Sequence, residues 1–213
     1  MFLLNESLVF PDPSEAGEEG LLAVGGDLSS DRLLLAYQSG IFPWYDDLQP
    51  ILWWSPDPRM VLFPSKFKVS KSLSKTIKSK KFSITFNTNF SEVIKNCSTI
   101  KRGGQAGTWI TQEMNEAYIQ LHHLGHAQSV EVWQQDELVG GLYGINLPKQ
   151  KIFCGESMFS TQTDASKVGF YYLVRHLQQK EYNLIDCQMH TDHLESLGAE
   201  EITRLKFLQY LNS

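Results

Sequence analysis

The sequence contains little of what membrane-spanning or secreted proteins need. No apolar run approaches the ~20 residues with which a helix crosses a bilayer. The first residues, MFLLNESLVFPDP, combine no basic stretch with a long apolar one, so we expect no signal peptide. The three cysteines, Cys97, Cys154 and Cys187, are odd in number and form no C-x-x-C pair. We interpret them as reduced thiols of a cytosolic protein.

Motifs for phosphate and metal binding are also missing. The glycine pairs at 25–26 and 140–141 lack the surroundings of a dinucleotide-binding loop or a P-loop. Residues 122–126 read HHLGH, which lacks the glutamate of a zinc helix and contains a helix-interrupting glycine. His190, Asp192 and His193 form only a loose metal candidate. We predict no metal site and interpret these histidines as hydrogen-bonded structural side chains.

Acidic residues are absent between 58 and 91, and this absence creates a strong charge asymmetry. From Arg59 to Arg102 there are 11 Lys/Arg and a single acid, Glu92, whereas the rest of the chain has 8 basic and 23 acidic residues. A basic segment of this kind favours a polyanion such as RNA or DNA, although a solvated surface explains it equally well. The lysines in question are Lys66, Lys68, Lys71, Lys75, Lys78, Lys80 and Lys81.

What is present indicates a folded protein with two parts. The chain has 213 residues, 42% of them hydrophobic and 12% aromatic, which is enough for a substantial core. Residues 1–62 are rich in Pro and Gly turn signals around one helix, which Ser29 or Ser30 caps and Gly40 ends. We therefore predict a small, loop-rich N-terminal domain at 1–62 and a larger domain at 63–213, with the basic segment at 66–102.

The second half of the chain alternates helical and strand patterns. We predict a short helix and a strand between 65 and 86, a helix after Thr111, a hairpin over 129–145, and a strand–helix–strand unit over 151–188. A short helix near 192–197 and a terminal segment follow. This order indicates an α+β (α/β-like) fold, and the strand–helix–strand unit should pair its strands in parallel.

Polar side chains end the two strands of that unit. Glu156 closes FCGES, and Asp186 and Gln188 lie two apart in LIDCQ, so in a regular strand they share one face. Ligands usually bind at the carboxyl ends of such parallel strands. The three residues therefore form either a proton-handling cluster or a buried structural network, and spacing alone does not decide between them.

Longer motifs, in order along nearly the whole chain, resemble the leucyl/phenylalanyl-tRNA–protein transferase family. The resemblance is carried by LLAVGGDL (21–28), GIFPWY (40–45), LWWSPDPRMVL (52–62), GTWI (107–110), LGHAQSVEVW (124–133), LVGGLYG (138–144), FCGESMFS (153–160), ASK (165–167), and LIDCQ with SLGA (184–199). It implies an aminoacyltransferase that moves Leu, Phe or Met from aminoacyl-tRNA to proteins beginning with Arg or Lys, which marks them as N-degrons. It also implies a GCN5-type acyltransferase-like mixed sheet with flanking helices in the C-terminal domain.

The resemblance assigns roles to particular residues. It implies Asp186 and Gln188 as the catalytic pair, with Glu156 at the aminoacyl end. Trp53 and Trp109 match tryptophans near the tRNA 3′-adenosine. The positions of an apolar aminoacyl pocket correspond to Leu142, Met158, Phe170, Leu173 and Ile185. No cofactor is implied, and we expect a cytoplasmic monomer without a membrane partner.

Two other functions remain open from the residues alone. A coenzyme-A-dependent N-acetyltransferase suits the expected fold, but it needs a glycine-rich loop before the helix at 164, where this chain reads TQTDAS. A non-enzymatic RNA-binding protein explains the lysines and tryptophans, but not the acid within the strand at 186.

Overall fold

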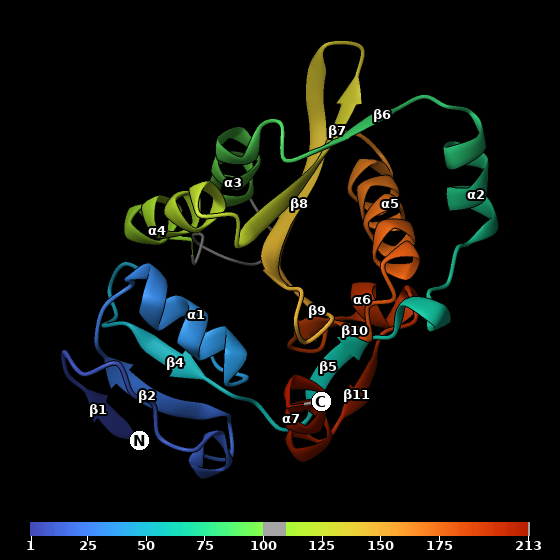
Figure 1. The fold of residues 1–213 in the computed structure, drawn as a ribbon. Coiled ribbons are helices and arrows are strands. Elements are labelled where there is room, and N and C mark those ends of the chain that lie inside the picture. Colours follow the sequence, from blue (N-terminus) through green and yellow to red (C-terminus); the bar gives the residue numbers. More distant parts are fainter. Residues whose placement is uncertain (100–109, 213) are drawn as a thin grey trace.

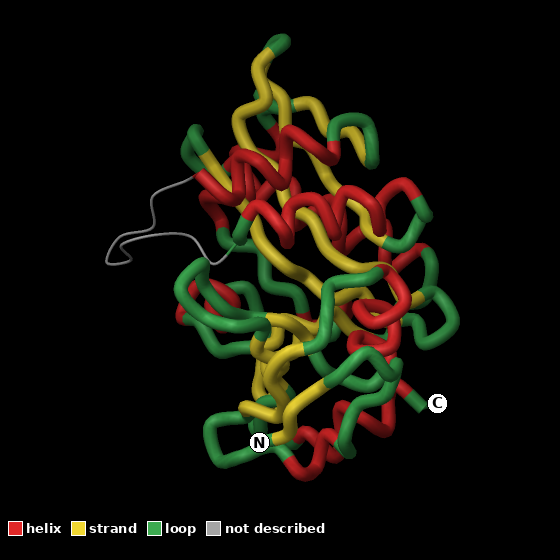
Figure 2. The backbone as a smooth tube through the Cα atoms, turned by 90° about the vertical axis from the view of Figure 1, so that its left-hand side faces the viewer, coloured by secondary structure: helices red, strands yellow, loops and turns green. Residues whose placement is uncertain are grey.

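The fold contains a small and a large β-sheet (Figures 1 and 2). A computed structural model describes residues 1–99 and 110–212 of the chain. The small sheet has the strand order β1-β2-β4-β3 and lies in the N-terminal part. Its strands are β1 (Phe2–Leu4), β2 (Leu21–Gly25), β3 (Phe42–Pro43) and β4 (Leu52–Trp54). A 3₁₀ turn, η1 (Pro13–Glu15), lies between β1 and β2.

The large sheet has the strand order β11-β5-β10-β9-β8-β7-β6. Strands β9 and β10 are parallel, as predicted for the strand–helix–strand unit, and all other neighbours are antiparallel. The strands are β5 (Arg59–Leu62), β6 (Ser83–Phe86), β7 (Ala127–Gln134), β8 (Glu137–Leu147), β9 (Ile152–Ser160), β10 (Leu184–Gln188) and β11 (Glu200–Ile202). This mixed sheet with flanking helices confirms the predicted α+β class.

Helices begin where the sequence offers capping side chains. Ser29, Ser70, Thr111, Thr191 and Thr203 each accept a hydrogen bond from a backbone N–H in the first turn that follows them. The helices are α1 (Ser30–Gln38), α2 (Lys71–Lys78), α3 (Phe90–Thr99), α4 (Gln112–His123), α5 (Ala165–Gln179), α6 (Asp192–Ser196) and α7 (Arg204–Leu211), with a 3₁₀ turn, η2 (Pro64–Lys66), before α2. Among the described residues, no helix combines the length and apolarity needed to span a bilayer.

Helices cover both faces of the large sheet (Figure 1). Helices α3 and α4 pack on one face, where Val93 and Tyr118 share a core cluster with Ile145. Helix α5 packs on the other face, where Phe170 and Leu173 share a second cluster with strand residues. Alternation along each strand produces this division, because successive side chains point to opposite faces.

The small sheet shares its hydrophobic core with the large one. Trp53 of β4 belongs to the same cluster of buried side chains as Ile145 of β8 and Phe207 of α7. Strand β5, which we had included in the N-terminal domain, pairs with β10 and β11 of the large sheet. The change from one sheet to the other therefore occurs between β4 and β5.

Candidate active site

Strands β9 and β10 each contain a bulge, in the middle of β9 and next to the last residue of β10. Their parallel pairing extends to the pair Asp186 and Cys154. Beyond it, Glu156 is an extra residue relative to β8, and Cys187 is an extra residue relative to β5. A bulge redirects the side chains beside it. Gln188, with a φ of 64°, turns so that its Nε2 donates to Glu156 Oε1 at 2.7 Å. The predicted proximity of these two side chains is confirmed.

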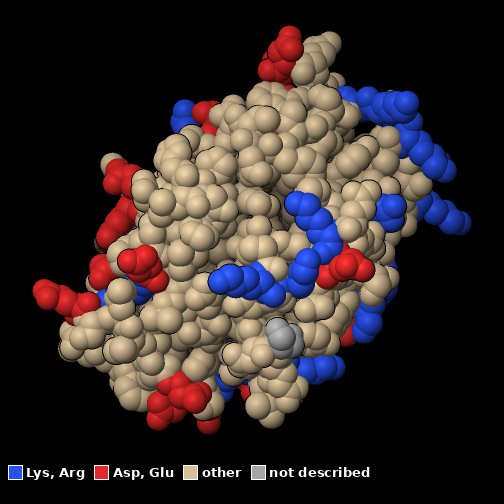
Figure 3. Space-filling view, in the orientation of Figure 1, with Lys and Arg blue, Asp and Glu red and all other residues tan. Residues whose placement is uncertain are grey.

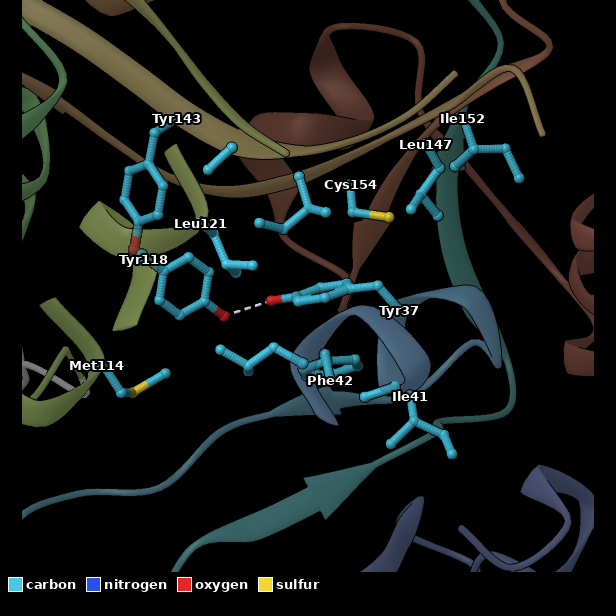
Figure 4. Packing of buried hydrophobic residues seen from close by; sticks show 14 of the residues in the cluster. Tyr37, Ile41, Phe42, Met114, Tyr118, Leu121, Tyr143, Leu147, Ile152 and Cys154 are labelled. Carbon is cyan, nitrogen blue, oxygen red and sulfur yellow. Dashed lines mark hydrogen bonds between the residues drawn. The ribbon is translucent and has the colours of Figure 1, made fainter. Parts of the chain in front are cut away.

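Two tyrosines complete the surroundings of Glu156. The Tyr118 hydroxyl donates to Glu156 Oε2 at 3.1 Å, and it also shares a short hydrogen bond with the Tyr37 hydroxyl (Figure 4). Burial raises the pKa of Glu156 to about 7, although hydrogen bonds from Tyr37, Tyr118 and Gln188 oppose this shift. Glu156 is therefore a carboxyl group that can both accept and release a proton near neutral pH.

We expect Asp186 and Gln188 to share one face of a regular strand, but β10 is irregular between them, and Gln188 lines the cavity described below whereas Asp186 does not. The bulge at Cys187 breaks the alternation on which that expectation depended. Asp186 is 1% exposed, and its two carboxylate oxygens accept from Arg59 Nε at 2.8 Å and Arg59 Nη2 at 2.7 Å. Its Oδ1 also accepts from the Gln188 backbone N–H at 3.0 Å. Asp186 thus contacts the site through the backbone of Gln188.

A cavity of about 620 Å³ opens beside the Glu156–Gln188 pair. Most of its wall is apolar, and its volume lies within the range of small-molecule sites. All five residues predicted for an aminoacyl pocket line it: Leu142, Met158, Phe170, Leu173 and Ile185. Phe153 and Cys187 join them, and His190, Thr191, His193 and Leu194 also line it. The cavity therefore has an apolar interior with one polar end.

The other wall of the cavity comes from the N-terminal part of the chain. Phe42, Pro43 and Trp44 line it, and Trp44 is 37% exposed. Trp53, by contrast, is fully buried, and its indole Nε1 donates to the Gly25 carbonyl at 2.8 Å. A ring enclosed in this way cannot stack on a base, so the prediction for Trp53 is wrong. Trp109 lies outside the described residues.

The seven predicted tRNA-binding lysines are all exposed, on η2, α2 and the segments next to them. In the space-filling view, Lys and Arg gather on the side of α2, whereas Asp and Glu are frequent on the opposite side (Figure 3). Lys66 is already paired, because its Nζ lies 2.6 and 2.8 Å from the Glu200 carboxylate oxygens. Within the described part of the chain the other lysines of the group form no ion pair with an acid, so they present net positive charge to solvent.

The histidines noted in the sequence have local roles. His122 stacks on Phe90 with 4.3 Å between ring centroids, and its Nδ1 lies 2.9 Å from the Ala127 carbonyl oxygen. At the cavity rim, His190 lies close to the carboxylates of Asp192 and Glu195, and all three side chains are exposed. Exposed acidic groups are common without an ion, so the absence of a metal site stays our prediction.

The start of α5 is unsuited to a pyrophosphate. Asp164 precedes the helix, accepts a hydrogen bond from Thr76 Oγ1 at 3.0 Å, and has a φ of 66°. A helix N-terminus attracts phosphate through its free N–H groups, but a carboxylate beside them repels it. This arrangement disfavours the coenzyme-A-dependent alternative, which would need its cofactor there.

Four residues of the site were missed or misassigned from the sequence. The sequence predicts no role in the site for Tyr37, Tyr118 or Trp44. Arg59 carried a usable signal, because it is a charged residue directly before the apolar run Met60–Leu62. A charge in such a position needs a buried partner, and that partner is Asp186.

Comparisons with known proteins agree with the geometry. Family models described as "Leucyl/phenylalanyl-tRNA protein transferase" and its N-terminal domain match residues 61–212 and 26–57. Proteins named leucyl/phenylalanyl-tRNA–protein transferase from Flavobacterium johnsoniae and Christiangramia forsetii are each 56% identical, over 213 and 211 residues. The alignments cover 100% and 99% of this chain, and 100% of each relative.

More distant relatives match as well. The protein of this name from Pseudomonas syringae is 54% identical over 213 residues, which are 99% of this chain and 92% of that protein. Among solved structures, FemX aligns with a TM-score of 0.47 and 11% identity over 86% of this chain and 71% of that one. On the evidence of the family models and of relatives identical at more than half of their positions, the chain belongs to the leucyl/phenylalanyl-tRNA–protein transferase family.

Proposed function

We propose that this protein is an aminoacyltransferase that moves Leu, Phe or Met from aminoacyl-tRNA to the α-amine of proteins whose first residue is Arg or Lys, and so forms an N-degron. The observation that carries this proposal is the apolar cavity, whose polar end consists of the hydrogen-bonded Glu156 and Gln188. Membership of the family supports it. No cofactor is required, because the donor is already an activated ester.

The cavity suits the side chain of the donor amino acid. Leu142, Phe170 and Leu173 are at most 4% exposed, and Met158 and Ile185 also contribute to the apolar wall. A wall of this kind distinguishes side chains by about 1–3 kcal/mol per methylene. It therefore favours large apolar side chains such as Leu, Phe and Met over small ones, and gives no hydrogen-bond partner to a polar one along that wall.

The terminal adenosine of the tRNA would lie at the mouth of the cavity. Trp44 is the partly exposed tryptophan there, and it takes the place that we had predicted for Trp53. Stacking on an indole contributes about 1–3 kcal/mol per base and accepts any base. We propose that Trp44, together with Trp109, holds the adenosine, while the exposed lysines of α2 contact the phosphates of the acceptor stem.

The chemistry needs one proton transfer and no redox step. The α-amine nitrogen attacks the ester carbonyl carbon, the ester C–O bond breaks, and the ribose oxygen of the adenosine leaves with a proton. The α-amine has an ordinary pKa near ~8, so a useful fraction is neutral at pH 7. Glu156, with a pKa of about 7, is placed to accept the proton that the amine loses. Gln188, whose neutral amide is a poor base, orients the reacting groups.

The acceptor protein brings a positive side chain to this site. Asp192 and Glu195 are exposed next to Thr191 and Leu194, which line the cavity. Their negative charge favours an N-terminal Arg or Lys. Since charged tRNA is a cytoplasmic substrate, we propose that the protein works in the cytoplasm and as a monomer.

Transfer of labelled leucine tests the proposal. Purified protein is incubated with radiolabelled Leu-tRNA and a peptide that begins with Arg, and the labelled peptide is measured. The matched controls are the same peptide with an acetylated N-terminus and a peptide that begins with Ala, neither of which should accept leucine. A protein that binds Leu-tRNA without labelling the Arg peptide would contradict the enzymatic role and favour plain RNA binding.

A further inference from the structure

Arg59 is a buried cation that joins three separate segments of the chain. It is the first residue of β5 and is 1% exposed. Its guanidinium carbon lies 4.8 Å from the centroid of the Phe42 ring and 4.6 Å from that of Phe207, and its Nη1 donates to the Gly40 carbonyl at 3.2 Å. A buried guanidinium is costly without such partners, so its position is closely defined.

The ion pair with Asp186 leads from Arg59 to the active site in three contacts. Arg59 holds both oxygens of Asp186, at 2.8 and 2.7 Å. Asp186 Oδ1 holds the backbone N–H of Gln188, the residue directly after the bulge. Gln188 Nε2 in turn donates to Glu156. A two-bond Arg–carboxylate pair fixes direction as well as distance, so it determines the backbone course at the point where Gln188 leaves the strand.

The same side chain also reaches the opposite wall of the cavity. Arg59 contacts Phe42, which belongs to the wall formed by residues 42–44. It also contacts Gly40, which lies two residues before that wall. One guanidinium group therefore contacts both the residue that supports the polar end of the cavity, Asp186, and the N-terminal wall.

From these contacts we infer that Arg59 is a positioning residue for aminoacyl transfer, which acts through Asp186 to place Gln188 against Glu156. In this arrangement Asp186 is not a base, because it is buried in an ion pair with Arg59 and does not line the cavity, whereas Glu156 does. The inference rests on the proposed function, since it assigns a role within that reaction.

The first test is Arg59→Lys, which keeps the positive charge but loses the two-bond geometry. Misplacement of a reacting group by about 1 Å costs up to about 10²-fold in rate, so we expect kcat for leucine transfer to fall by about tenfold to 10²-fold. The KM values for Leu-tRNA and for the peptide should change less than kcat, because Arg59 does not line the cavity and contacts its wall only through Gly40 and Phe42. A folded Arg59→Lys protein with the wild-type kcat would overturn the inference.

Arg32→Lys is the matched control. Arg32 is also fully buried, and it pairs with Asp27 at 3.2 Å and with the Asn5 carbonyl at 2.8 Å, but neither of these partners lines the cavity or contacts Asp186. The same chemical change there should lower thermal stability and leave kcat unchanged. Equal losses of kcat in both variants would show a general effect of removing a buried arginine, and would also overturn the inference.

Combination with Gln188→Ala separates positioning from plain structural damage. If Arg59 acts through Gln188, the double variant should be no slower than Gln188→Ala alone, whereas independent effects would multiply. Multiplying effects, or a Gln188→Ala variant with full activity, would contradict the inference. If Arg59→Lys does not accumulate as folded protein, Asp186→Asn replaces it in the same cycle, because it retains the side-chain volume and disrupts the two-bond pair. Absence of transfer in the wild type would instead contradict the proposed function.

Discussion

Two carboxylates within the large sheet, Glu131 on β7 and Glu156 on β9, show how surroundings decide between structure and chemistry. Glu131 is fully buried and accepts from the hydroxyls of Ser129, Thr85 and Thr88 at 2.5 to 2.9 Å. It also accepts from the backbone N–H groups of Thr88 and Asn89 at 3.4 and 3.3 Å, just before α3. Glu156 accepts from Gln188 and Tyr118 and lies beside an open cavity.

The pKa values of the two carboxyl groups are shifted in opposite directions. Burial raises the pKa of Glu131, but the hydrogen bonds from Ser129, Thr85, Thr88 and Asn89 outweigh it, so the net pKa is lowered. For Glu156, burial outweighs the hydrogen bonds and raises the pKa to about 7. A buried carboxyl with many donors therefore stays ionised and holds structure together, whereas one with few donors can exchange its proton.

The largest expected effect is on catalysis, and it separates the two glutamates. Glu156→Gln removes the proton acceptor and keeps the shape, so leucine transfer at saturating substrates should fall by about 10²-fold or more. Glu131→Gln should leave the single-turnover rate of the folded protein within about twofold of the wild type. Equal rates in the two variants would break the distinction between a chemical and a structural carboxylate.

The next effect concerns stability, and here the larger loss is expected at Glu131 rather than at Glu156. Glu131→Ala leaves several buried donors without an acceptor, so the free energy of unfolding should fall by about 2–3 kcal/mol. Glu156→Ala should cost less, because water in the cavity can satisfy Gln188. Urea denaturation of both variants at neutral pH measures the difference. A larger loss for Glu156→Ala would mean that its network is primarily structural.

The smallest effect is the pH dependence of stability, which should have opposite sign at the two residues. The pKa of Glu131 is lowered, so its contribution is present above the ordinary value of 4.5 and is lost as the pH falls through the folded-state pKa. The pKa of Glu156 is raised to about 7, so its neutral form favours folding, and that contribution is lost as the pH rises from 4.5 to about 7.

Urea denaturation between about pH 4 and pH 8 checks these signs. Relative to the wild type, Glu156→Gln should gain stability as the pH rises, because its side chain cannot ionise. Glu131→Gln should lose stability relative to the wild type only at the acidic end, as the pH rises from about 4 to about 5, because the unfolded wild-type chain there still binds a proton that the folded protein has released. If the free energy of unfolding of both variants followed the same pH dependence as that of the wild type, the two carboxyl groups would not differ electrostatically.

The sequence predicted those parts of the fold that depend on local signals. Helices α1 and α4 begin after Ser29 and Thr111 as expected, because a capping hydroxyl before an apolar stripe is a short-range feature. We assigned no element to residues 90–99, which form α3, and left α7 as an unspecified terminal segment. The three-residue strands β1, β4 and β11 were missed too, since their existence depends on distant pairing partners.

The candidate site was predictable where it depends on parallel pairing. That pairing brings Glu156 and Gln188 together, and the predicted pocket residues line one cavity. The ion pair of Arg59 with Asp186 joins residues 127 positions apart, and no local pattern specifies it. The bulge at Cys187 and the burial of Trp53 likewise depend on tertiary packing, and both led to errors.

The wall formed by Phe42, Pro43 and Trp44 has an evolutionary consequence. Since the cavity is closed partly by the first portion of the chain and partly by the last, neither portion could be exchanged for an unrelated module without reshaping substrate recognition. Gene fusion or shuffling at the change of sheets would therefore be selected against, and both portions should be inherited as a single unit.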